Sequence, residues 1–197
     1  MRTVWVSYDT MGRACLEAAA ASGAEVVGIV TLPGPVDPLR SGQCSFDESA
    51  RRHRAELIET TDVNSGETLA EIDSLAPELI FVVGWGQLVR DPFIALAGEG
   101  VFGMHPTLLP RHRGRAAIPW AILSGLATTG VTLFQIVDAT ADSGAIVGQV
   151  EVPIAPDETA TTLFDRITEL SAPGSRTRRS SSVGARSASR PRSSRTS

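Results

Sequence analysis

A histidine and an aspartate are the residues of this sequence best suited to proton transfer. His105 ends the apolar run GVFGMH (100–105), and Asp142 lies in the polar stretch DATADSGA (138–145). A histidine titrates near neutrality, so it can take and give a proton in one turnover. A carboxylate beside it could orient the imidazole and stabilise its charged form. The alternatives are a hydrogen-bonded structural histidine and an ordinary Asp turn before Gly144.

The segment that follows His105 is basic and contains two prolines, which stiffen it. In this segment, PTLLPRHRGR (106–115), Arg111, Arg113 and Arg115 surround Gly114. Guanidinium groups bind phosphates and carboxylates through paired hydrogen bonds, so these arginines could hold an anionic substrate. The alternative is a solvated surface loop.

The short stretch GWGQL (84–88) follows the strongly apolar run LIFVV. Its backbone groups and the flat ring of Trp85 could form a slot for a planar heterocycle. The alternative is a tight turn whose tryptophan packs in the core.

Strands and helices are predicted to alternate along the chain. We expect strands at 3–8, 25–32, 79–84, 100–105, 130–137 and 145–154, and a shorter one within 57–63. Helices are expected at 10–23, 47–57, 65–76, 116–126 and 159–170, and another begins with Asp91 as its N-cap and Pro92 at its first position. This alternation predicts an α/β fold, a Rossmann-like three-layer sandwich with a mostly parallel central sheet.

The predicted topology brings the three candidate segments together. In open α/β sheets, ligands bind at the carboxyl ends of the strands near the point where the strand order reverses. GWGQL, His105 and the stretch 138–145 each follow a predicted strand or connect two strands. The first strand is followed by SYDTMG without a GxGxxG pattern, which disfavours a dinucleotide site.

Charge divides the chain into two parts. Residues 1–170 contain all 22 acids and 11 arginines, whereas residues 171–197 contain seven arginines and no acid. The acidic body disfavours a general nucleic-acid surface. The Ser/Arg-rich tail is predicted to be disordered. Its composition fits an out-of-frame reading of a GC-rich gene, and the alternative is an RNA-binding arm.

Cysteine content and hydropathy indicate the cellular compartment of the protein. Cys15 and Cys44 lie far apart and fit neither a metal knuckle nor a disulfide framework. No apolar run approaches the roughly 18 residues of a membrane span, and the N-terminus reads as a first strand instead of a signal peptide. We expect a cytoplasmic protein of one catalytic domain, residues 1–170, with no membrane partner.

Taken together, the motifs GMHPTLLPRHRG, IPWAILSG, GVTLF and DSG resemble the formyltransferase family, which uses 10-formyltetrahydrofolate. Its members act on methionyl-tRNA, glycinamide ribonucleotide or amino sugars. The family pattern is Asn-x-His, Pro or Gly, Ser or Thr, Leu-Leu-Pro, a basic pair and Gly, followed by Gly-Val-Thr and an Asp-x-Gly loop. The looser matches VSYDTMGRACLEAA and FVVGWGQLV extend the resemblance toward residue 1.

The resemblance implies a role for each matching position and no metal ion. His105 corresponds to the catalytic histidine and Asp142 to its aspartate. The expected folate-binding residues are Val83, Gly84, Trp85, Gly86, Gln87, Leu88, Val89, Asp138, Ala139, Thr140 and Ala141. The expected acceptor-binding residues are Thr107, Arg111, Arg113, Gly114 and Arg115.

The sequence departs from the family pattern at one catalytic position. The family's asparagine, two residues before the histidine, is Gly103 here. That asparagine donates a hydrogen bond to the formyl oxygen, and loss of one such donor typically costs about 10² to 10³ in rate. A glycine leaves room for a water or a neighbouring side chain. Thr107, Gln87 and protonated His105 are the candidate replacements.

These observations predict an N-formyltransferase with a small, anionic amine acceptor, such as a nucleotide-linked amino sugar or a biosynthetic amine. One alternative is a methionyl-tRNA formyltransferase-like protein without the C-terminal domain of those enzymes, which the acidic body disfavours. The other is a catalytically impaired relative that still binds folate.

Overall fold

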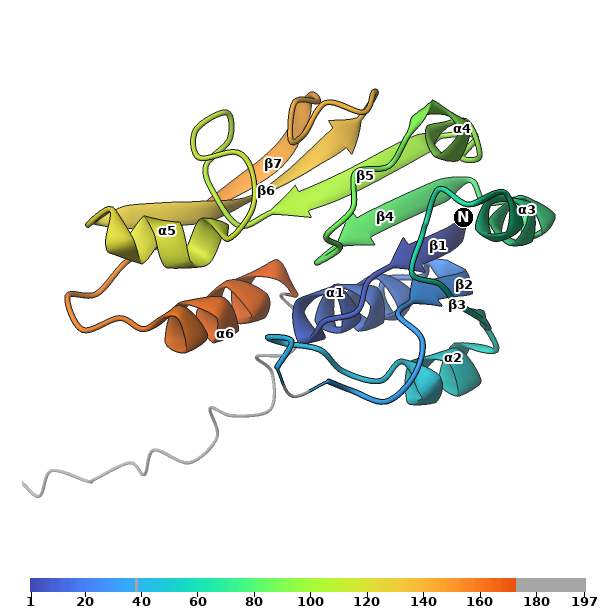
Figure 1. Cartoon of the computed structure of the whole chain (residues 1–197), viewed down its shortest axis with the longest axis horizontal. Coiled ribbons are helices and arrows are strands. Elements are labelled where there is room, and N and C mark those ends of the chain that lie inside the picture. Colours follow the sequence, from blue (N-terminus) through green and yellow to red (C-terminus); the bar gives the residue numbers. More distant parts are fainter. Residues whose placement is uncertain (38, 173–197) are drawn as a thin grey trace, which may run out of the picture.

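The computed structural model describes residues 1–37 and 39–172 of the 197-residue chain (Figure 1). The last helix extends through Ser171, and Ala172 is buried. The remainder of the predicted Ser/Arg tail lies outside the described residues.

Strands and helices alternate as the sequence predicts. The strands are β1 (Arg2–Val6), β2 (Glu25–Thr31), β3 (Glu56–Glu59), β4 (Leu79–Val83), β5 (Gly100–His105), β6 (Thr128–Ile136) and β7 (Ile146–Pro153). The helices are α1 (Thr10–Ala21), α2 (Asp47–His53), α3 (Gly66–Ser74), α4 (Asp91–Ile94), α5 (Ala117–Leu123) and α6 (Ala160–Ser171).

All seven strands form one sheet in the order β3-β2-β1-β4-β5-β6-β7. The first five strands in this order run parallel, whereas β6 is antiparallel to β5 and β7 is antiparallel to β6. The order reverses between β1 and β4, because the chain continues from β1 to β2 on one side and later returns to place β4 on the other. The predicted mostly parallel α/β fold is confirmed.

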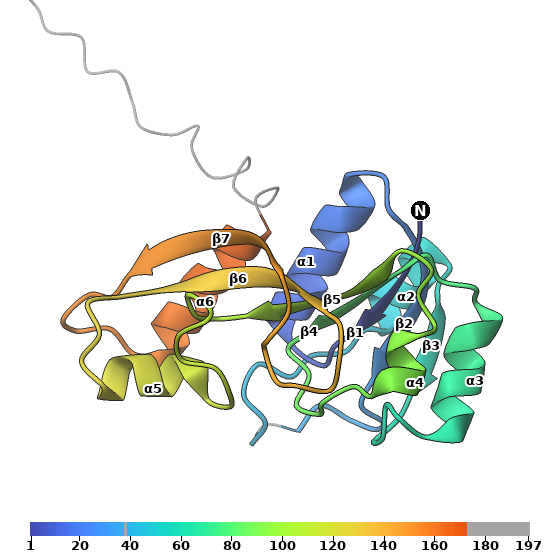
Figure 2. The ribbon, with the colours of Figure 1, turned by 90° about the horizontal axis from the view of Figure 1, so that it is seen from above.

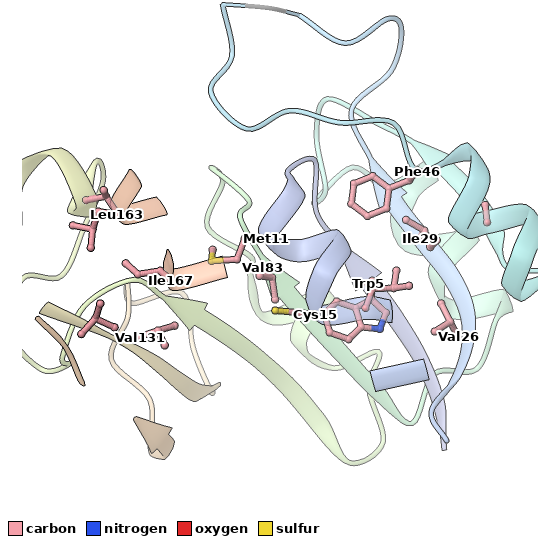
Figure 3. Packing of buried hydrophobic residues seen from close by; sticks show 14 residues of the cluster. Trp5, Met11, Cys15, Val26, Ile29, Phe46, Val83, Val131, Leu163 and Ile167 are labelled. Carbon is pink, nitrogen blue, oxygen red and sulfur yellow. The ribbon is translucent and has the colours of Figure 1, made fainter. Parts of the chain in front are cut away.

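Helices cover both faces of the sheet (Figures 1 and 2). Neighbouring residues of a strand point to opposite faces, so β1 contributes Trp5 to one core cluster and Val4 to the other. The first cluster contains side chains of α1, α2, α5 and α6, several of which are drawn in Figure 3. The second contains Ile72 of α3 and Phe93 of α4. The molecule is therefore the three-layer sandwich that was predicted.

Several predicted element boundaries differ from the observed ones by up to four residues, and two predictions about named residues are wrong. The helix expected over 47–57 ends at His53, because Arg54 adopts a left-handed conformation with φ of 55°. Glu56 and Leu57 instead begin β3, where they pair with β2. The second error is small: Arg90, and not Asp91, is the N-cap residue of α4, and Asp91 is its first helical residue.

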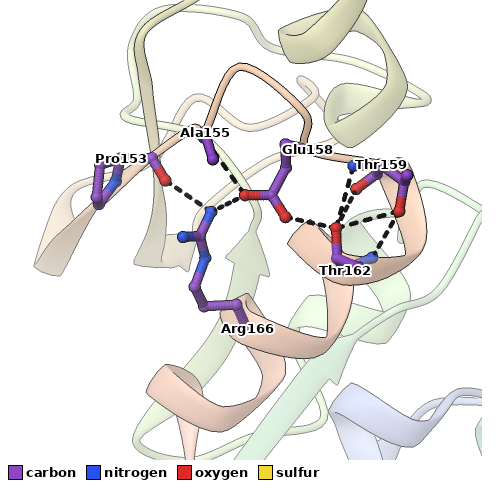
Figure 4. Close-up of polar contacts among 6 residues, drawn as sticks. All are labelled: Pro153, Ala155, Glu158, Thr159, Thr162 and Arg166. Atoms are coloured by element: carbon purple, nitrogen blue, oxygen red, sulfur yellow. Dashed lines mark hydrogen bonds and ion pairs between the residues drawn. The ribbon is translucent and has the colours of Figure 1, made fainter.

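Polar contacts connect α6 to the end of the edge strand β7 (Figure 4). The Thr159 hydroxyl accepts a hydrogen bond from the Thr162 backbone N–H at 3.2 Å, and the Thr162 hydroxyl accepts one from the Thr159 N–H at 3.0 Å. This reciprocal arrangement satisfies two backbone donors at the helix start. Arg166 donates to the Pro153 carbonyl at 2.7 Å and forms an ion pair with Glu158. These contacts connect α6 with the last residue of β7.

Within the described residues, no helix has the length and apolar character needed to cross a membrane.

Candidate active site

The last residue of β5 is His105, at the carboxyl edge of the sheet. Val101, Gly103 and His105 are the buried residues of this strand and point to the same face, because strand side chains alternate. The histidine is 8% exposed. Its place at a strand end agrees with the crevice predicted from the topology.

Both ring nitrogens of His105 face oxygen atoms. Nε2 lies 3.1 Å from the backbone carbonyl oxygen of His112, and Nδ1 lies 3.6 Å from Oδ1 of Asp142. A carbonyl oxygen only accepts hydrogen bonds, so Nε2 is the nitrogen that carries a hydrogen in this arrangement. The distance between Nδ1 and the carboxylate is within ion-pair range and too long for a good hydrogen bond. The predicted pair of His105 and Asp142 is thus brought together.

Asp142 also holds two loops in place. Its Oδ2 accepts a hydrogen bond from the backbone N–H of Gly114 at 2.9 Å. Asp142 adopts a left-handed conformation with φ of 51°, which Asp and Asn tolerate better than most residues. This carboxylate therefore ties the connection between β6 and β7 to the basic loop after His105.

Thr107 is buried within the loop, and its hydroxyl already has a protein partner. It is 1% exposed, and its hydroxyl donates to the Arg111 carbonyl at 3.1 Å. Its carbonyl accepts from the Thr132 hydroxyl at 2.7 Å, and Gln149 donates to Leu109 O at 2.7 Å. The geometry favours a structural role for Thr107 over the expected contact with an acceptor.

The guanidinium groups of Arg111, Arg113 and Arg115 belong to exposed residues. None of them forms a hydrogen bond or ion pair with another residue in ranges 1–37 and 39–172. The loop presents positive charge close to His105, since the same loop supplies the His112 carbonyl. The predicted anion-binding loop is compatible with this placement.

At Gly103, the aromatic ring of Phe134 fills the space beside the backbone. Gly103 pairs with Phe134 across β5 and β6. A methyl group on Gly103 would lie 2.7 Å from Cζ and 2.9 Å from Cε1 of Phe134, and 3.1 Å from Cδ1 of Ile136. An asparagine would therefore collide with apolar atoms. Of the two alternatives left by the sequence, a neighbouring side chain fills the space, and it offers no hydrogen-bond donor.

Gln87, one of the candidate replacements, is engaged elsewhere. Its Oε1 accepts from the Val63 N–H at 3.1 Å, and its Nε2 donates to the Thr61 carbonyl at 3.0 Å. The Thr107 hydroxyl is also occupied, as described above. His105 Nε2 also has a protein partner, the His112 carbonyl, so each of the three candidate donors is already hydrogen-bonded within the protein.

The segment from Val83 to Val89 starts at the end of β4 and turns sharply at Gly84, which has φ of 65°. Trp85 packs partly against the second core cluster, and its buried indole N–H has no hydrogen-bond partner among the described residues. Its ring lies 5.9 Å from that of Tyr8. Packing in the core and a role in a ligand slot are thus compatible for Trp85.

Asn64 anchors this segment and was not singled out by the sequence. Its Nδ2 donates to the Leu88 carbonyl at 3.0 Å, and its Oδ1 accepts from the Arg90 N–H at 2.9 Å. The only local signal is an asparagine in the turn-like stretch DVNSG. The His112 carbonyl was missed as well, because sequence patterns carry no information on a single backbone oxygen.

The loop from Asp138 to Ala141 lies between β6 and β7 and is mostly exposed. Asp138 accepts a hydrogen bond from the Thr140 N–H at 2.7 Å. This bond, together with those from the Thr140 and Ser143 side chains, lowers the pKa of Asp138 below its ordinary value. The hydrogen bond between Thr140 and Asp138 closes a turn just before Asp142.

Other features of the described residues do not converge on this site. Among residues 1–37 and 39–172, no group of three or more His, Cys, Asp or Glu side chains could hold a metal ion. Two surface hollows, of about 400 and 600 Å³, share Arg54 and Ala55. They lie beside α2 and the start of β3, whereas His105 is at the opposite ends of the strands.

Comparisons with known proteins identify the family and the fold. A family model described as "Formyl transferase" matches residues 6–174. The fold is similar to that of phosphoribosylglycinamide formyltransferase from Bacillus halodurans, with 20% identity, a TM-score of 0.75, and coverage of 89% of this chain and 91% of that one. Glycinamide ribonucleotide transformylase 1 from Geobacillus kaustophilus is 26% identical, with a TM-score of 0.70 and coverage of 88% and 94%. A sugar 3N-formyltransferase solved with dTDP and 5-N-formyl-THF is 19% identical, with a TM-score of 0.67 and coverage of 88% and 59%.

Proposed function

Because this chain belongs to the formyl transferase family, we propose that it moves a formyl group from 10-formyltetrahydrofolate to the amine of a small, anionic acceptor. The family is one of folate-dependent one-carbon transferases, and the acceptor is our inference. The observation that carries the proposal is the pair of His105 and Asp142 beside three exposed arginines.

The chemistry requires one proton to move between two nitrogen atoms. The amine nitrogen attacks the formyl carbon, a C–N bond forms, and the carbonyl electron pair moves onto oxygen. When the carbonyl reforms, the bond between the formyl carbon and N10 of the folate breaks. The amine nitrogen loses a proton and N10 gains one. His105 is suited to carry that proton, because an imidazole can both accept and donate one and Asp142 faces Nδ1 at 3.6 Å.

Residues 83–89 and 138–141 are proposed to hold the folate. Supporting this, the buried Trp85 N–H has no partner within residues 1–37 and 39–172 and could donate to a ligand. The segment is also held firmly, since Asn64 binds both Leu88 and Arg90. A fixed backbone suits recognition of a flat heterocycle by main-chain hydrogen bonds.

An anionic acceptor is favoured by Arg111, Arg113 and Arg115, whose side chains are exposed close to His105. Two kinds of acceptor are named for proteins of similar fold, phosphoribosylglycinamide and a sugar. Both kinds are candidates here. The excess of acids over arginines in residues 1–170 counts against a tRNA acceptor. The free thiols of Cys15 and Cys44 suit the reducing cytoplasm, where we place the reaction.

The second candidate function is folate binding with impaired catalysis. It is favoured by Phe134, whose ring occupies the place of the family asparagine at Gly103. Without that donor, charge on the formyl oxygen is stabilised less, and the rate falls by about 10² to 10³ unless His105 compensates.

The decisive experiment has a binding stage and a turnover stage. In the first, the full chain is titrated calorimetrically with 5-formyltetrahydrofolate, and we expect saturation at one site. In the second, formyl transfer from 10-formyltetrahydrofolate is assayed with phosphoribosylglycinamide and with a dTDP-linked amino sugar. His105→Ala and Asp142→Asn should lower kcat by about 10² to 10⁴ and leave folate binding intact.

The control variant is His53→Ala, which removes a histidine on α2 that pairs with Glu17. It should turn over like the wild type. Undiminished kcat in His105→Ala would refute the site, and absence of folate binding by the wild type would refute the function. Folate binding without turnover of any amine would establish the second candidate.

A further inference from the structure

The carboxyl group of Asp9 is buried where the strand order reverses. Asp9 follows β1 and is the N-cap residue of α1, with 6% of its surface exposed. Its Oδ1 accepts a hydrogen bond from the Gly12 N–H at 2.8 Å, and its own N–H donates to the Ser7 hydroxyl at 3.2 Å. The adjoining strand β4 leads into Gly84, the first residue of the turn that opens the proposed folate segment.

This carboxyl group lies directly against Gly84. A methyl group on Gly84 would be 2.1 Å from Oδ2 and 2.3 Å from Cγ of Asp9, so no larger residue fits while Asp9 keeps this position. The positive φ of Gly84 requires glycine for a second reason. Gly12 is equally confined, because a methyl group there would lie 1.9 Å from Ser7 Oγ and 2.9 Å from the Val83 carbonyl oxygen. The Asp9 carboxyl group therefore packs tightly against the start of the segment 83–89.

Two thiols are the titratable groups that interact electrostatically with Asp9. Cys15 comes from α1, and Cys44 comes from the segment that pairs with the stretch after β1. Burial raises the pKa of Cys15 to about 12, and burial also raises the pKa of Cys44, so both thiols are neutral between pH 5 and 8. Its other neighbours include Ser7, Gly42, Gln43 and the backbone of Met11, Gly12 and Gly84, none of which titrates in this range.

We propose that Asp9 is a positioning residue for the segment 83–89, and that ligand binding there takes up a proton onto the Asp9 carboxyl group. The proposal rests on the proposed function, since it takes this segment to be the folate site. A ligand that covers the segment removes water from the carboxylate behind Gly84, and removal of water disfavours the charged form. Folate also carries carboxylates of its own, which repel a charged Asp9.

Burial already acts in this direction in the free protein, where it raises the pKa of Asp9 from 3.8 to about 6. The hydrogen bonds from Gly12, Ser7 and Met11 oppose the rise without cancelling it. Above about pH 6, Asp9 is charged in the free protein, so the proton that it takes up on ligand binding must come from the solvent. Affinity should therefore fall as the pH rises through this value, by about tenfold if the bound ligand raises the pKa by one further pH unit.

Proton uptake is the measurement that tests this coupling. The full chain is titrated with 5-formyltetrahydrofolate at pH 6.5 in buffers of different ionisation enthalpy, which gives the number of protons bound with the ligand. Wild type should take up more protons than Asp9→Asn. Asn is as good an N-cap as Asp, so the helix start is kept while the titration is removed. His105 is present in both proteins, and its contribution cancels in the difference.

Two further variants complete the design. Asp73→Asn removes an exposed carboxylate from α3 and should behave as the wild type. Asp9→Ser keeps a good cap and replaces Asp9→Asn if the latter fails to fold. Equal proton uptake by wild type and the position 9 variant, with both binding the ligand, overturns the role of Asp9 and leaves the proposed function standing. No binding by the wild type overturns both.

Discussion

At the scale of single residues, the contact between Gly103 and Phe134 decides how this site stabilises charge. The phenyl ring gives the formyl oxygen no hydrogen bond, and the side chains of Thr107 and Gln87 are held by other partners. In the proposed reaction His105 would therefore have two tasks, to carry the proton and, when protonated, to face the developing oxyanion, and the second requires Nε2 to leave the His112 carbonyl.

A pair of substitutions tests this interpretation. Gly103→Asn alone should destabilise the protein, since even its Cβ would lie 2.7 Å from the Phe134 ring, and overpacking typically costs about 1–3 kcal/mol. Gly103→Asn combined with Phe134→Ala provides both the amide and the room for it. The double variant should transfer formyl groups about 10² to 10³ times faster than Phe134→Ala, as measured by single-turnover rates. Equal rates would mean that the amide does not reach the formyl oxygen.

At the scale of elements, the sequence predicts most of what the structure contains. Apolar, β-branched runs and turn residues locate six strands directly, and the four-residue β3 overlaps the short strand expected within 57–63. The predicted end of the helix after residue 47 is wrong, since Arg51, Arg52 and Arg54 favour continuation, whereas Arg54 turns left-handed and Glu56 pairs with β2. That pairing involves residues far apart in the chain, which local patterns do not report.

The sequence likewise predicts some features of the candidate site and not others. The placement of His105 and Asp142 follows from the strand order and the family resemblance. The ring of Phe134 over Gly103 depends on the register between β5 and β6, which a single sequence does not fix. Asp9 carried a signal, a carboxylate at the end of the first strand, but its burial against Gly84 depends on the strand that arrives about 75 residues later.

The capping arrangement of α6 offers a test at this scale. Thr159→Ala removes the side-chain acceptor for the Thr162 N–H and should lower the free energy of unfolding by about 1 kcal/mol. Thr161→Ala is the matched control, because Thr161 is exposed within the same helix. Denaturant unfolding of both variants gives the comparison. A loss of equal size in the two variants would show that the cap does not stabilise α6.

At the scale of the whole molecule, the arginines of the basic loop stand out against an acidic body. Arg111, Arg113 and Arg115 are exposed in the part of the chain, residues 1–170, where acids outnumber arginines two to one. The proposed anionic acceptor would therefore be repelled by the acidic excess of residues 1–170 and attracted at the loop. Such attraction is screened by salt over about 10 Å at 0.1 M ionic strength.

Steady-state kinetics should reveal this local attraction. With the acceptor that turns over, Arg111→Ala, Arg113→Ala or Arg115→Ala should raise KM by about tenfold if that arginine binds the anion, with a smaller change in kcat. Higher salt should raise the KM of the wild type and have less effect on the variant. Arg51→Ala, on α2 far from His105, should leave KM unchanged. An unchanged KM in all three loop variants would exclude the anion-binding role.

The mixture of parallel and antiparallel strands determines which parts of the candidate site can open separately. Residues 83–89 and Asp9 belong to the parallel part of the sheet, whereas the pair of His105 and Asp142 depends on the antiparallel run from β5 to β7. This run ends in an edge strand whose residues, apart from Val152, are exposed. Edge strands with few buried side chains open at low free energy. Brief opening of β7 would release Asp142 together with residues 138–141, while residues 83–89 stay folded. The amides of these two parts of the proposed site should therefore exchange in separate transitions.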